Sequence, residues 1–227
     1  MFFWLHIEKG TTMSEISENG PASGNAGKPA ESDRADVEEI LEAYRNVAEL
    51  CRWIPGEGQE AVEARIRVYG AFDRLAALEE AAGEHSSGLA ARESATSMIR
   101  QAHQLAGDHV ALRLMEASQL NSRGFTLREM ENWRDALDIY TELAELLDDG
   151  ADGSYMALYL MAAAQDGIGD IQDALGDGEA RDVAWERARI LFQSCIHARN
   201  RDPEAGSGSD HLRNLLDDVI AKQKEVS

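Results

Sequence analysis

Three aspartates in the second half of the chain have the spacing of a binding stripe. Asp166, Asp170 and Asp173 follow one another at i, i+4 and i+7, so they share one face if the segment is helical. Like charges at this spacing destabilise a helix by about 0.2–0.5 kcal/mol per pair. A bound cation or basic peptide would relieve that repulsion, which makes the stripe a candidate site for a basic partner. The alternative is a solvated face in an acidic protein.

Residues that could support catalysis or metal binding lack the spacing that such sites require. None of the 6 histidines has a glutamate three residues before it, so the di-iron Glu-x-x-His pattern is missing. The turn that begins at Asp148 resembles a calcium loop, but Tyr159 holds the twelfth position, where a bidentate glutamate belongs. Cys195 and His197 are close in sequence, yet Cys195 falls on an apolar stripe and is interpreted as a core residue. We therefore expect no catalytic residue, no metal and no cofactor.

The elements that carry these residues are predicted to be helices. Apolar residues recur at three-and-four spacing along most of the chain, and no stretch alternates with period two. The expected helices span residues 32–54, 57–82, 86–106, 109–130, 133–147, 154–175, 180–199 and 210–224. Short connections make consecutive helices antiparallel neighbours.

The apolar faces of these helices also define an expected core. Trp53, Trp133 and Trp185 lie on or beside apolar faces, where core packing is the expected role of a tryptophan. Tyr44 and Cys51 fall on the apolar face of the first helix and are expected to point inward. Ser86 or Ser87 is expected to cap the third helix.

The most regular helical pair, residues 118–147, carries a recognisable set of residues. Ala136 lies twelve residues after Gly124 and Tyr140 sixteen residues after it, with Trp133 at the start of the second helix. This pattern resembles the tetratricopeptide repeat, whose signature includes a glycine in its first helix and A-x-x-x-F/Y in its second. In this interpretation Gly124 and Ala136 permit close helix approach, and Tyr140 fills the space towards the next hairpin.

A second, stretched copy is predicted around Gly169 and Gly176, with Ala188 and Phe192 as its A-x-x-x-F pair. Ala188 lies nineteen residues after Gly169 instead of twelve, so about seven residues are expected to be inserted within this unit. An earlier copy is suggested near Gly70 and residues 91–95.

The resemblance implies an all-α fold in which antiparallel helical hairpins stack as a short TPR-like α-solenoid. The alternative is a compact helical bundle. The expected organisation is a disordered leader over 1–31 and a helical domain over 32–227, with the clearest unit at 109–148, the stretched unit at 153–200 and a capping helix at 208–226.

The resemblance also implies a binding groove, because the first helix of each hairpin lines the concave face in this family. The implied binding residues are Asn121, Phe125 and Arg128 in the clearest unit and Asp166, Asp170 and Asp173 in the stretched unit. We therefore expect a non-enzymatic scaffold or adaptor that binds a peptide or protein segment. The alternative is an accessory or regulatory subunit that uses an exposed helical face.

Composition narrows the class of partner. With 22 Lys+Arg against 42 Asp+Glu, the net charge is −20, which argues against nucleic acid and favours a basic protein segment. The 2 cysteines have no paired spacing, as expected in a reducing compartment. No stretch reads as a membrane span or export signal, so we expect a cytoplasmic protein without membrane contact.

Overall fold

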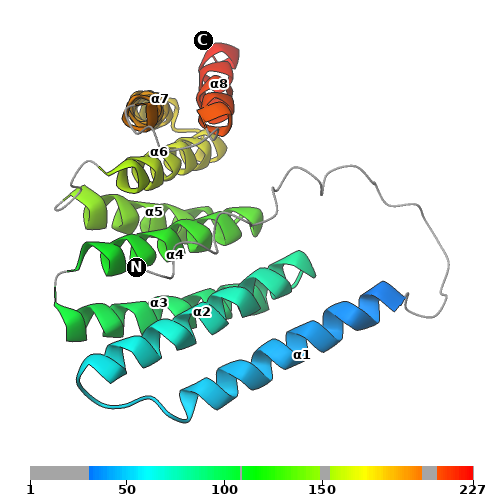
Figure 1. The fold of residues 1–227 in the computed structure, drawn as a ribbon. Helices are drawn as coiled ribbons and strands as arrows, with labels where there is room; N and C mark the ends of the chain where they lie inside the picture. Colours follow the sequence, from blue (N-terminus) through cyan, green and yellow to red (C-terminus); the bar gives the residue numbers. More distant parts are fainter. Residues whose placement is uncertain (1–30, 108, 149–153, 201–208, 227) are drawn as a thin grey trace. The chain divides into compact units, whose positions relative to one another are not determined.

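The described part of the chain is helical throughout. In the computed structural model, the described residues are 31–107, 109–148, 154–200 and 209–226. Within these ranges the chain forms eight helices and no strand (Figure 1): α1 Glu31–Cys51, α2 Gln59–Ala81, α3 His85–Ala106, α4 Val110–Glu129, α5 Trp133–Asp148, α6 Tyr155–Leu175, α7 Gly178–Asn200 and α8 Ser209–Glu225. The chain divides into two units, residues 1–34 and 35–227, and the helix contacts belong to the second.

All eight expected helices are confirmed, with ends displaced by three residues or fewer. Ser154 caps α6, since its hydroxyl accepts a hydrogen bond from the Ala157 N–H at 3.3 Å. The predicted serine cap of α3 is wrong, because α3 begins at His85 and both serines lie inside its first turn. The predicted leader and most of the calcium-like turn lie outside the described residues.

The helices pack as consecutive antiparallel hairpins. The three hairpins are α2 with α3, α4 with α5, and α6 with α7. Each second helix also contacts the helix that follows it, giving the pairs α3–α4, α5–α6 and α7–α8, and α4 additionally contacts α6. The all-α arrangement of helical hairpins expected from the sequence is therefore present.

Each of the three hairpins turns at a residue with positive φ. These corner residues are Gly83 (φ 81°), Glu131 (φ 56°) and Gly176 (φ 79°). After each corner the buried positions follow the same count. The twelfth residue is Ala95, Leu143 or Ala188, and the sixteenth is Ile99, Leu147 or Phe192, all with relative exposures of 1% or less. The second helices of the three hairpins thus bury residues at the same sequence distances from their corners.

The ninth residue after each corner packs against the first helix of its hairpin. It is Arg92, Tyr140 or Trp185, and each is buried. A Cβ added at Gly124 would lie 2.7 Å from Cζ of Tyr140, and one at Gly167 would lie 2.6 Å from Cε2 of the same ring. The Tyr140 ring is therefore held between α4 and α6, as predicted for its role between hairpins.

The same count corrects the predicted alignment of the stretched unit. Trp185, rather than Ala188 or Phe192, packs against Gly169, and the separation of sixteen residues equals that of Gly124 and Tyr140. Only Gly176 and Asp177 separate α6 from α7, so no insertion lies within this hairpin. Gly70, proposed as an earlier copy's glycine, has nothing within 4 Å of the place its Cβ would take, so it makes no close helix approach.

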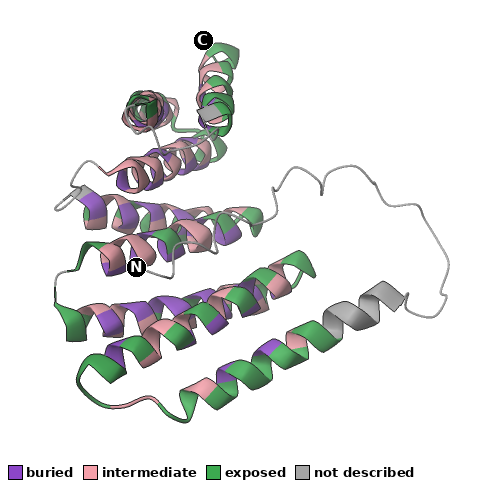
Figure 2. Ribbon diagram, viewed as in Figure 1, coloured by how far each residue is buried: buried purple, intermediate pink, exposed green. Residues whose placement is uncertain are grey.

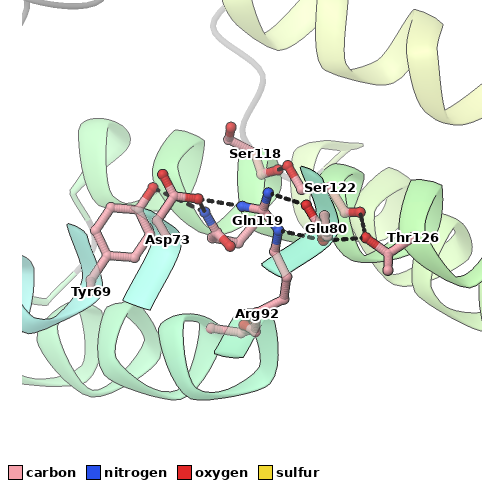
Figure 3. Close-up of polar contacts among 9 residues, drawn as sticks. Tyr69, Asp73, Glu80, Arg92, Ser118, Gln119, Ser122 and Thr126 are labelled. Atoms are coloured by element: carbon pink, nitrogen blue, oxygen red, sulfur yellow. Dashed lines mark hydrogen bonds and ion pairs between the residues drawn. The ribbon is translucent and has the colours of Figure 1, made fainter. Parts of the chain in front are cut away.

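In the first hairpin the ninth-residue position is polar, and a buried network surrounds it (Figure 3). Arg92 donates to Glu80 Oε2 at 2.8 Å and also pairs with Asp73. From α4, Gln119 Nε2 donates to Asp73 Oδ1 at 2.6 Å, and the Thr126 hydroxyl donates to Glu80 Oε1 at 2.6 Å. Because both carboxylates bind side chains from two other helices, this network fixes the register of α2, α3 and α4.

Some predicted core residues are exposed instead, most of them at the start of the chain. Trp53 is 80% exposed and Tyr44 is 46% exposed, and Cys51 is also on the surface. The described part of α1 buries only Ala43 and Val47, against α2 (Figure 2). Ile40 and Leu50 are partly covered by the same cluster, whereas Leu41 stays exposed. Trp185 and Cys195 are buried as predicted, and Trp133 is partly buried against the core.

Candidate functional site

The six residues predicted to line a groove lie on α4 and α6, which contact each other. Asp166, Asp170 and Arg128 meet in one cluster, whereas Phe125 and Asp173 are exposed and Asn121 is half-buried. Only Asp166, Asp170 and Arg128 of the six predicted residues therefore form a common site.

Asp170 is the centre of the cluster. Its Oδ1 accepts hydrogen bonds from the Trp185 Nε1 at 3.1 Å and from the Lys222 Nζ at 2.9 Å. Its Oδ2 lies 3.1 Å from the Arg128 Nη1. The Lys222 Nζ also donates to Asp166 Oδ1 at 3.0 Å. We name these five residues, Arg128, Asp166, Asp170, Trp185 and Lys222, the Asp170 cluster.

The Asp170 cluster changes the interpretation of the acidic stripe. Arg128 and Lys222 of the same chain pair with the two carboxylates, and Lys222 also lies 3.4 Å from Oδ2 of the exposed Asp218. The side chains of Asp166 and Asp170 are only 19% and 21% exposed. The basic group that the stripe was expected to attract is Lys222 from α8. These two aspartates are therefore neither a solvated face nor free carboxylates, and they hold α4, α6, α7 and α8 together.

Burial and neighbouring charges raise the pKa values of both Asp166 and Lys222, for different reasons. Burial, with the adjacent Asp170 carboxylate, raises the pKa of Asp166, and the Lys222 ammonium only partly opposes this. Burial would lower the pKa of Lys222, but Asp166 and Asp170 outweigh it and raise that pKa above its usual value. Lys222 is therefore charged throughout the neutral range.

Asp173 belongs to a separate pair at the end of α6. It is 48% exposed and accepts a hydrogen bond from the Arg181 Nη1 at 2.9 Å. The Arg181 guanidinium lies 5.4 Å from the centre of the Trp185 ring, in position for a cation–π contact. All three aspartates of the predicted stripe are thus paired with cations of this chain.

Two of the three cations, Lys222 and Arg181, were not predicted to take part in the site, whereas Arg128 was. Lys222 lies 52 residues from Asp170, so helical periodicity carries no information about their contact. Arg181 is the fourth residue of α7, two residues after Glu179, and this position alone does not specify which carboxylate it pairs with.

Phe125 is the predicted groove residue left available to a partner. It is 47% exposed, although its neighbour Gly124 is buried against Tyr140. The backbone of α4 is thus fixed by close packing while this aromatic ring faces solvent. Such rigidly presented aromatic residues are typical anchors of protein interfaces.

A cavity of about 390 Å³ lies next to α3 and α4. It is lined by Arg100 and Arg123, but Arg100 donates to Glu116 at 2.7 Å and also pairs with Glu142. Arg123 lies 3.5 Å from Glu93. Three glutamates thus surround two guanidinium groups, so the charge does not favour an added anion.

The described residues contain no group of three or more His, Cys, Asp or Glu side chains that could hold a metal ion. No helix in the described ranges is long and apolar enough to cross a membrane. Burial raises the pKa of the Cys195 thiol to about 12, so this thiol is not poised as a nucleophile.

No known protein family matches the sequence, and a comparison with curated proteins finds no relative. The argument for function therefore depends on the fold and its surfaces.

Proposed function

We propose that this protein is a non-enzymatic interaction scaffold whose helical hairpins bind a segment of another protein. The exposed ring of Phe125 on the tightly packed α4 is the observation that carries the proposal. A tetratricopeptide-like α-solenoid is the proposed architecture, supported by the three hairpins that share one count from corner to core. The proposed setting is the cytoplasm.

Charge indicates the class of partner. The net charge of −20 favours a basic segment, although Asp166 and Asp170 do not supply the free carboxylates. Recognition by Phe125 would then be apolar, with long-range attraction from the remaining acidic surface speeding the encounter.

Affinity capture from cells of the source organism, followed by mass spectrometry, tests this function. Wild-type protein is compared with Phe125→Ala and with Leu105→Ala, a matched loss of an exposed side chain that is 42% accessible on α3. We expect Phe125→Ala to reduce the captured partner by about tenfold or more, the usual effect of removing an interface anchor. Leu105→Ala should capture as the wild type does.

If Phe125→Ala captures as much partner as the wild type does, Phe125 is not the anchor of the interface. Circular dichroism of each variant establishes that the helices are intact, which separates loss of a contact from loss of folding.

A further inference from the structure

An uncovered groove lies between α5 and α7, and α6 forms its floor. Its volume is about 550 Å³. Apolar side chains from all three helices line it, among them Ala144 of α5, Ile168 of α6 and Val183 of α7. Val183 is 49% exposed, as is Ile190 two turns further along α7. We name this depression the α5–α7 groove.

The cavity beside α3 and α4 occupies the position equivalent to this groove when residues are counted from the corner residues. Ala144, thirteen residues after Glu131, corresponds to Thr96, thirteen after Gly83. Ile168, eight residues before Gly176, corresponds to Arg123, eight before Glu131. Thr96 and Arg123 line the cavity beside α3 and α4 described above. The two depressions are thus equivalent places on successive hairpins.

The two equivalent places differ in how they are filled. In the first, the guanidinium of Arg123 forms the floor and pairs with Glu93, while Arg100 of α3 pairs with Glu142 of α5 across the depression. In the second, the floor is Ile168, and among side chains that the structure describes no hydrogen bond or ion pair joins α5 to α7. The α5–α7 groove therefore lacks the polar bridge that closes its counterpart, and its apolar floor is open.

The rim of the groove carries charge on both sides. Glu145 of α5 and Glu179 of α7 are exposed carboxylates at its edges, and Arg187 is the one guanidinium that lines it. Asp177, whose carboxylate caps the start of α7, also lines the groove. Three carboxylates against one cation, on a chain of net charge −20, attract a positively charged partner.

We propose that the α5–α7 groove binds an amphipathic helix of another protein, which places small apolar side chains on Ile168 and Val183 and Lys or Arg side chains beside Glu145 and Glu179. A helix fits because the groove runs between two helices, whose surface ridges can take the ridges of a third. This inference rests on the proposed function and adds a second surface, distinct from Phe125, with a partner of stated chemistry.

The test is a display library of helical peptides, selected for binding to the full-length protein. The recovered peptides should carry apolar residues at i, i+3, i+4 and i+7 and an excess of Lys and Arg. Val183→Glu should weaken their binding about tenfold or more, because it places a charge on the apolar contact. The matched control is Val110→Glu on α4, where the valine is 45% exposed, and its binding should stay within about twofold.

Two further variants examine the chemistry of the groove. Ile168→Arg installs the floor residue of the closed counterpart and should weaken binding to a similar extent. Glu145→Lys with Glu179→Lys reverses the rim charge and should weaken the basic peptides about tenfold while leaving circular dichroism unchanged.

The outcomes separate the inference from the proposed function. Peptides that bind Val183→Glu as tightly as wild type, yet lose affinity with Phe125→Ala, would overturn the groove and support the function. A library that yields no binder would count against both. Self-association in sedimentation equilibrium that Val183→Glu abolishes would mean that a second copy occupies the groove, and would overturn the proposed partner.

Discussion

Close packing at single residues determines how the hairpins approach one another. Tyr140 contacts the backbone of two helices at once, because both Gly124 and Gly167 lack a Cβ where its ring lies. The ring is 2% exposed, and burial raises the pKa of its hydroxyl to about 12, which the nearby Arg128 guanidinium partly opposes.

Adding a methyl group at these glycines should destabilise the fold. Gly124→Ala and Gly167→Ala would each place a Cβ within 2.8 Å of a ring atom of Tyr140, and the overpacking should cost about 1–3 kcal/mol. Gly70→Ala is the matched control, because its Cβ meets nothing within 4 Å and alanine favours the helix by about 1 kcal/mol. Urea denaturation should show loss for the first two and gain for the third. Equal effects at all three positions would contradict the packing of Tyr140.

The buried hydroxyl of Tyr140 should make the protein sensitive to alkaline pH. The pKa of native Tyr140 is about 12, whereas in the unfolded chain its pKa is the usual 10.0. The unfolded state thus binds fewer protons as pH rises, so the stability from this group is complete below pH 10 and is lost towards pH 12. Tyr140→Phe should remove about 1 kcal/mol of the loss seen by pH 11. Urea titrations at several pH values measure this, and Tyr155→Phe, at a half-buried tyrosine, is the control.

At the scale of elements, α8 completes the surface of α6 and α7. Leu212 and Val219 are fully buried against α7, and Lys222 brings its ammonium to Asp166 and Asp170. The contacts of the last helix, which was predicted to cap the domain, are thus both apolar and ionic. A partner that needed the two aspartates would have to displace Lys222.

Removing the Lys222 ammonium should loosen α8. Lys222→Ala leaves two carboxylates at low exposure with one cation fewer, and an unpaired buried charge costs about 1–3 kcal/mol. Hydrogen exchange should increase in α8 and in the middle of α6. Lys224→Ala, two residues on and exposed, should change neither exchange nor stability by more than about 0.5 kcal/mol. A similar response to both substitutions would mean that the Asp170 cluster does not anchor α8.

Sequence reasoning predicted the elements well because helical periodicity is a local property. The buried residues of α5, among them Ala136, Tyr140, Leu143 and Leu147, could be read directly from their spacing. The partners of Asp166 and Asp170 could not, since they come from α4, α7 and α8. Trp53 shows the complementary limit: a residue beside an apolar stripe is buried only if another element covers it, and none among the described residues does.

At the scale of the whole molecule, the chain has more negative charge than its own cations can neutralise. If every one of the 22 Lys+Arg side chains were paired, 20 of the 42 Asp+Glu side chains would still have no cation, since 42 − 22 = 20. This self-repulsion opposes the compact state, and it attracts basic partners to every surface of the protein, including the α5–α7 groove.

Added salt should therefore stabilise the fold. Raising NaCl from about 0.02 M to about 0.5 M shortens the screening length from about 20 Å to about 4 Å. The repulsion among 20 excess charges should outweigh the weakening of surface ion pairs, which contribute about 0–1 kcal/mol each. We expect a gain of about 1 kcal/mol, or about 2–4 °C in the melting temperature for a chain of this size.

NaCl is the appropriate salt for this measurement, because sulfate would also strengthen apolar burial. Glu145→Gln with Glu179→Gln removes two exposed carboxylates and should reduce the dependence on salt while raising stability at low salt. A melting temperature that falls with NaCl would instead mean that the internal pairs, chiefly those of Arg92 and Lys222, outweigh the net charge. In that case the acidic surface would attract partners without destabilising the fold.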